Sequence, residues 1–151
     1  MTPPETIVLR GYPVRLGALE SEHIDEVVRE FQLIALSQPH QPDRTPHRLL
    51  ALVERMTGQY AGDRTERDRL REQALADGVP TVDLVFPVLP ESRSGVQAWT
   101  QMWQDVEAYC RTDDLLALAA PDEVLDLRAW VLSQFLAQLD GQEPRAWTGP
   151  V

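Results

Sequence analysis

The sequence predicts a mainly α-helical fold: an irregular bundle of about five helices with one or two short extended segments, forming a single domain over residues 1–151. Three observations lead to this prediction. Apolar residues recur at three- and four-residue spacing along most of the chain. Only the segment 79–89 alternates as a strand does. The chain has 151 residues, 43% of them hydrophobic, so one core suffices for it.

The chain begins with an expected loose terminus, residues 1–5, and an extended segment, residues 7–16. Pro13 cannot donate a ladder hydrogen bond, so this segment can be at most a short edge strand. The first helix is expected over about 21–37, with Ser21 as its N-cap. Its apolar face is predicted to comprise Ile24, Val27, Val28, Phe31, Ile34 and Ala35.

The next two helices differ in their apolar surface. Thr45 followed by Pro46 is typical of a helix start, and this second helix is expected to end at Gly58 or Gly62. The third helix, about 64–77, is unusually charged and must therefore lie on the outside. Its expected apolar contacts are Leu70, Ala74 and Leu75.

The second half of the chain begins with the alternating segment 79–89, which its prolines keep short. A fourth helix is expected to start at Ser92 or Ser94 and to end near Arg111. A connector over 112–120 follows. The last helix is expected to start at Pro121 and stop at Gly141, and the tail 143–151 to be loose and irregular.

The charge of the chain restricts its partners and its location. A net charge of −10 repels phosphate backbones and anionic lipid, so nucleic acid and membrane surfaces are not expected as partners. A basic surface of another protein would be attracted instead, although acidity also serves solubility. Cys110 is the single cysteine and no apolar signal core or membrane span is visible, so a cytoplasmic location is predicted.

No pattern in the sequence identifies a catalytic reaction. His23, His40 and His47 lack the spacing of metal ligands, and glycine-rich phosphate loops are absent, so no metal and no cofactor are predicted. Cys110 lies near a helix C-terminus, which disfavours a thiolate, so it is interpreted as a small buried hydrophobe. The protein is therefore predicted not to be an enzyme, although a dispersed site around His23 or His47 stays open.

Two sets of residues are candidates for binding. The first would contact a protein partner through spare aromatic and arginine side chains on the third and fourth helices. Its members are Arg64, Arg67, Arg71, Trp99 and Trp103. The alternative is a small-molecule sensor with a pocket between the two C-terminal helices. Its expected residues are Tyr109, Arg128 and Trp130.

Three segments, 82–90, 107–123 and 128–147, resemble a group of uncharacterised helical proteins of high-GC bacteria. Members of that group often accompany anti-sigma-factor kinases and their antagonists in partner-switching regulation. The resemblance implies a noncatalytic regulatory adaptor that binds a signalling kinase or an antagonist. It implies no catalytic residues, and homodimerisation is compatible with it.

Overall fold

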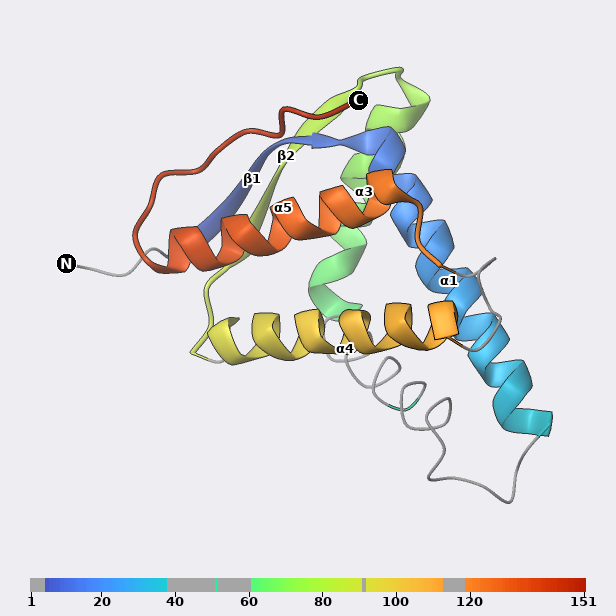
Figure 1. Ribbon diagram of the computed structural model, residues 1–151. Coiled ribbons are helices and arrows are strands. Elements are labelled where there is room, and N and C mark those ends of the chain that lie inside the picture. The colour runs from blue at the N-terminus through green and yellow to red at the C-terminus, as the bar shows by residue number, and fades with distance from the viewer. Residues whose placement is uncertain (1–4, 38–50, 52–60, 91, 113–118) are drawn as a thin grey trace.

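The computed structural model describes residues 5–37, 51, 61–90, 92–112 and 119–151, and it is mainly helical, as predicted (Figure 1). The described part contains four helices and one two-stranded sheet, so the expected count of about five helices is slightly too high there. The predicted second helix and most of the predicted connector fall outside the described residues. None of the described helices is long and apolar enough to cross a membrane. The elements are β1 (Thr6–Pro13), α1 (Val14–Ser37), α3 (Ala61–Ala76), β2 (Thr81–Pro87), α4 (Ser92–Thr112) and α5 (Asp122–Leu139).

The two strands form an antiparallel ribbon that joins the N-terminal segment to the middle of the chain. Leu9 pairs with Leu84, and both side chains are buried on the ribbon face that meets α5. The register shifts between Leu9 and Tyr12, and Gly11, with φ of 65°, occupies the shift because its backbone conformation is left-handed. The strand predicted over 79–89 and the edge strand predicted over 7–16 are thus both present and paired with each other.

The second edge of β1 is covered by α5 and the tail. The side-chain amide of Gln138 accepts a hydrogen bond from Val8 N at 2.9 Å and donates one to Val8 O at 2.8 Å. Trp147 N donates to Arg10 O at 3.0 Å, so the irregular tail 143–151 runs beside β1, as Figure 1 shows. These contacts satisfy backbone groups that an open strand edge would leave to water.

Helix α1 begins at Val14, seven residues before the predicted start at Ser21. Tertiary contacts explain the correction, because Val14 N donates to Pro80 O at 3.0 Å and the Val14 and Leu16 side chains are buried. Gly17 lowers the helix propensity of this turn, but an added Cβ would lie only 2.5 Å from the Tyr12 ring. Packing therefore favours helix where local propensity does not.

The core is divided into two clusters. The first, here called the α1–α4 cluster, lies between those two helices and comprises Val27, Phe31, Met102, Trp103, Val106 and Cys110. The second, the ribbon–α5 cluster, comprises Leu9, Tyr12, Leu16, Leu84 and Leu127. Helix α3 contributes little to either: Ala74 is buried as predicted, but Leu70 and Leu75 are exposed, which corrects their predicted role as contacts. The charged α3 does lie on the outside.

Candidate functional site

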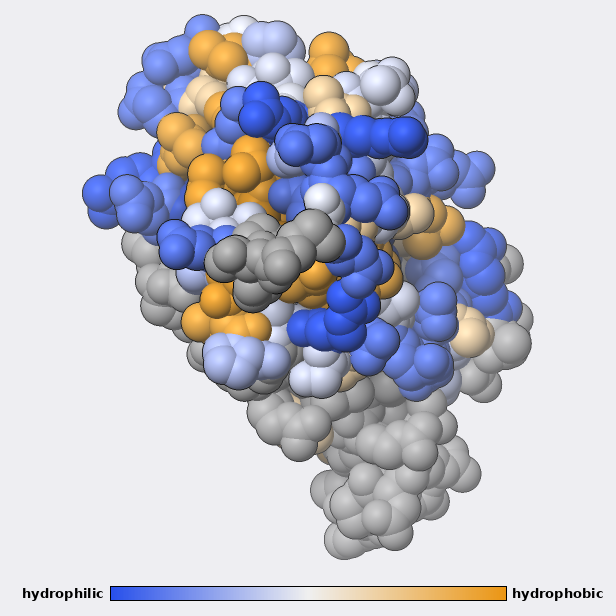
Figure 2. Space-filling view, turned by 90° about the vertical axis from the view of Figure 1, so that its left-hand side faces the viewer, coloured by the Kyte–Doolittle hydropathy of each residue, from blue (hydrophilic) through white to orange (hydrophobic). Residues whose placement is uncertain are grey.

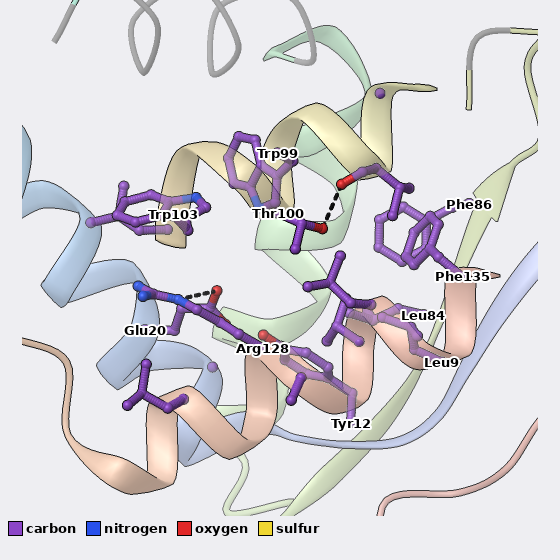
Figure 3. Close-up of a pocket in the computed structure, with 18 of the residues that line it drawn as sticks. Leu9, Tyr12, Glu20, Leu84, Phe86, Trp99, Thr100, Trp103, Arg128 and Phe135 are labelled. Carbon is purple, nitrogen blue, oxygen red and sulfur yellow. Dashed lines mark hydrogen bonds and ion pairs between the residues drawn. The ribbon is translucent and has the colours of Figure 1, made fainter. Parts of the chain in front are cut away.

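A cavity of about 700 Å³ lies between the two core clusters. Helices α1, α3, α4 and α5 and both strands contribute side chains to its wall (Figure 3). Most of the wall is apolar, and Figure 2 shows apolar residues framed by hydrophilic ones on the face where α4 begins and α5 ends. The apolar wall includes Leu9, Leu84, Phe86, Val96, Trp99, Leu132 and Phe135.

Arg128 is the most buried cation of this cavity, with 9% of its surface exposed. Its Nε atom donates to Glu20 Oε1 at 3.4 Å, and its guanidinium lies 4.4 Å from the Trp103 ring centroid. Its Nη2 atom lies 2.7 Å from His23 Nδ1, which must accept the hydrogen bond because a guanidinium has only donors. Burial lowers the pKa of Arg128, and Glu20 opposes that shift. These contacts join α5 to α1 and α4.

Helix α3 places two further guanidinium groups against aromatic rings. The Arg67 guanidinium lies 4.2 Å from the centroid of Phe86, and that of Arg71 lies 5.8 Å from the centroid of Tyr12. Arg71 also forms an ion pair with Asp68. Burial, followed by the charge of Glu20, raises the pKa of Tyr12 to about 12, although Arg71 opposes the shift. Both arginines line the cavity, so it has a basic wall beside its apolar ones.

The structure brings together most of the residues of the predicted protein-binding set, but around a cavity. Arg67, Arg71, Trp99 and Trp103 all line it, and the two indoles meet edge to face with centroids 5.9 Å apart. The side chain of Arg64 lies outside the described part of the structure. The two tryptophans contact each other, whereas Arg67 and Arg71 contact Phe86 and Tyr12.

The predicted pocket residues are divided between the cavity and the core. Arg128 lines the cavity, to whose wall α4 and α5 contribute together with α1, α3 and both strands. Tyr109 instead packs on Phe31, with ring centroids 5.6 Å apart. Trp130 meets Trp147 edge to face, with centroids 5.4 Å apart, and is not among the lining residues.

Sequence reasoning missed the residues that the N-terminal segment contributes. Tyr12, Gly17 and Glu20 line the cavity, yet the sequence placed them in an extended segment or before the first helix. Gly17 leaves space for the Tyr12 ring. Glu20 accepts a hydrogen bond from Arg128, which lies 108 positions away in the sequence. No local pattern could have indicated a pair so distant in sequence.

The remaining candidates for chemistry do not form a site in the described structure. Cys110 is fully buried, and burial with the nearby Glu107 carboxylate raises the pKa of its thiol to about 11. A thiol with such a pKa is a poor nucleophile near neutral pH. Among the described residues, no group of three His, Cys, Asp or Glu side chains could hold a metal ion. His40 and His47 lie outside them.

Comparison of the chain with protein-family models, with curated proteins and with solved structures found no match. The cavity therefore supports a functional argument only through its own size, shape and chemistry.

Proposed function

We propose that this protein binds a small, largely apolar molecule in the cavity between the α1–α4 cluster and the ribbon–α5 cluster. The cavity carries this proposal: its volume of about 700 Å³ lies within the roughly 300–1,000 Å³ typical of small-molecule sites. Its wall combines mainly apolar side chains with a few fixed polar groups, the composition that such sites share. The protein would thus act as a sensor or carrier.

The cavity is partly open to solvent, so its apolar walls face water rather than protein atoms. Apolar walls that face such a space lose dispersion contacts, which a bound ligand would restore. The aromatic residues Trp99, Phe86 and Phe135 contribute to this wall, and aromatic side chains provide large contact areas for ligands.

A variant that fills the cavity tests this proposal. Val96 lines the cavity from α4, whereas the next residue, Gln97, is exposed, so Val96→Trp and Gln97→Trp form a matched pair. We expect the unchanged protein and Gln97→Trp to bind a neutral apolar dye such as Nile red saturably, at one site, as followed by dye emission. Val96→Trp should lose this binding while its circular dichroism stays helical. Equal binding by both variants would show that the dye sites lie elsewhere and would refute the proposal.

A regulatory protein that binds a protein partner is the second candidate, favoured by apolar side chains on the surface. Leu33 and Leu36 near the end of α1 are 55% and 77% exposed, and Leu70 and Leu75 of α3 are exposed as well. Contiguous exposed apolar surface is typical of contact surfaces, and Leu33 and Leu36 lie about one turn apart on the same helix. The partner would be cytoplasmic, such as a signalling kinase or its antagonist, or a second copy of the chain.

Size-exclusion chromatography with light scattering, followed by affinity capture, tests this second candidate. A Leu33→Glu/Leu36→Glu variant should lose a dimer or a captured stoichiometric partner that the unchanged protein retains. A monomer that captures the same proteins with and without the two substitutions would argue against this surface.

A further inference from the structure

We propose that the ligand of the cavity is an amphipathic carboxylate, with its apolar body against α4 and α5 and its carboxylate at Arg67 and Arg71 on α3. This inference rests on the proposed function and adds the chemical class of the ligand. Its starting point is the juxtaposition of a basic wall with apolar walls inside one cavity.

The charge of the cavity is opposite to that of the protein. Within the described lining there are four arginines and two glutamates, in a chain whose net charge is −10. Arg128 pairs with Glu20 and Arg111 with Glu107, and Arg71 pairs with Asp68, so the excess of positive charge in the lining is partly offset and is concentrated on α3. An anionic ligand complements this lining, and a cationic one does not.

Arg67 and Arg71 suit a carboxylate because of how they are held. They lie one helical turn apart on α3, and each guanidinium lies over an aromatic ring, Phe86 or Tyr12. A guanidinium carries five N–H donors in its plane, and carboxylate oxygens accept them with favourable geometry; Arg71 uses part of its donors on Asp68 and on the Tyr12 hydroxyl. These contacts also fix the long side chains, which reduces the entropy lost on binding.

Three of the aromatic rings that line the cavity are already occupied by cations and cannot serve as a cage for another one. Such a cage needs ring faces that are open to the ligand. Guanidinium groups already lie over Phe86, Tyr12 and Trp103 at 4.2, 5.8 and 4.4 Å from the ring centroids. A quaternary ammonium or an alkylamine would therefore meet positive charge where it needs an aromatic face.

The apolar part of the wall is suited to an alkyl or ring system. Trp99 and Val96 of α4 and Leu132 and Phe135 of α5 line the same cavity as the two arginines, and Figure 3 shows Phe135 beside Phe86 and Leu84. The Phe86 and Phe135 rings meet edge to face with centroids 5.2 Å apart. Burying an apolar chain here contributes roughly 25 cal/mol per Å² of apolar surface.

A series of ligands that differ only in the head group tests the inference on the unchanged protein. Dodecanoate and dodecylamine, each below its critical micelle concentration, and dodecanol, below its aqueous solubility, would be titrated by displacement of Nile red. We expect dodecanoate to bind about tenfold or more tightly than dodecanol, because charge-assisted hydrogen bonds add to the burial that both share. Dodecylamine should bind most weakly.

Substitutions on α3 test the position of the carboxylate. Arg67→Gln/Arg71→Gln should weaken dodecanoate binding by about tenfold or more and leave dodecanol binding unchanged. Arg69→Gln is the matched control, because Arg69 is an exposed arginine of the same helix that is not among the lining residues. It should leave the affinity for both ligands unchanged.

The possible failures are distinguishable. Equal affinities for dodecanoate and dodecanol, or tightest binding of dodecylamine, would overturn the inference; if Val96→Trp still abolishes that binding, the proposed cavity function stands. Binding that Val96→Trp leaves intact would refute the proposed function itself. If Arg67→Gln/Arg71→Gln does not fold, the head-group series on the unchanged protein still decides.

Discussion

The two halves of the core surround one cavity but are held in different ways. In the α1–α4 cluster, apolar side chains such as Phe31, Met102 and Val106 from two long helices pack against each other. In the ribbon–α5 cluster, apolar packing is supplemented by hydrogen bonds that join α5 and the tail to the backbone of β1. The difference teaches that one wall depends on side-chain volume, whereas the other also depends on polar groups at fixed positions.

The largest expected effect comes from removing volume in the α1–α4 cluster. Phe31→Ala should lower the free energy of unfolding by about 4 kcal/mol, because Phe31 is completely buried and its loss leaves a void. Leu33→Ala, an exposed position on the same helix, should cost less than about 0.5 kcal/mol. Urea denaturation of both variants measures the difference, and similar midpoints would show that α1 does not depend on this packing.

The next effect concerns the connection between the two halves. Arg128→Ala should cost about 3 kcal/mol, because it removes the ion pair with Glu20 and the hydrogen bond to His23 in a largely buried position. The control is Arg93→Ala, which breaks the exposed ion pair with Asp140 and should cost less than about 1 kcal/mol. Thermal unfolding by circular dichroism compares the two. A larger loss of stability in Arg93→Ala than in Arg128→Ala would mean that Arg128 does not join the two halves of the core.

A smaller loss of stability is expected from a substitution at the ribbon–α5 cluster. Gln138→Ala should cost about 2 kcal/mol, because Val8 N–H and C=O both lose their partner at a part-buried edge. Hydrogen exchange followed by NMR should show faster exchange of the Val8 amide. The exposed Gln142→Ala should leave that amide unchanged. Unaltered protection of Val8 in Gln138→Ala would show that the tail, and not Gln138, covers this edge.

The smallest effect is a dependence on pH through Cys110. Its pKa is raised from about 9 to about 11 in the folded protein, so the unfolded chain releases the proton first as the pH rises. The thiol therefore contributes its full share of stability below pH 9, and this share is lost between about pH 9 and 11. The free energy of unfolding of Cys110→Ala should therefore fall less between pH 9 and 11 than that of the unchanged protein.

Tyr12, whose pKa is about 12, changes stability in both proteins alike, so the difference between the two curves isolates the thiol. A parallel decline of the two curves would contradict the raised pKa of Cys110. Such a result would also indicate that water reaches the α1–α4 cluster, which would weaken its description as a dry, volume-dependent core.

Much of the secondary structure could be predicted from the sequence because its signals are local. Helices α4 and α5 end close to the predicted positions, and the alternation of Val82, Leu84 and Phe86 correctly indicated β2. The start of α1 could not be predicted, since Ser21 offers a local cap and the contact of Val14 with Pro80 is distant in sequence. The exposure of Leu70 and Leu75 was likewise decided by where α3 lies.

The sequence by itself determined a mainly helical, acidic chain with aromatic and arginine side chains as candidate contacts, because composition and periodicity are properties of short windows. Only the tertiary structure decided that Arg67, Arg71, Arg128, Trp99 and Trp103 share one cavity with Tyr12 and Glu20. These residues come from five elements, and their meeting depends on how the two core clusters are spaced. That spacing arises from long-range contacts between whole elements, which no window of the sequence contains.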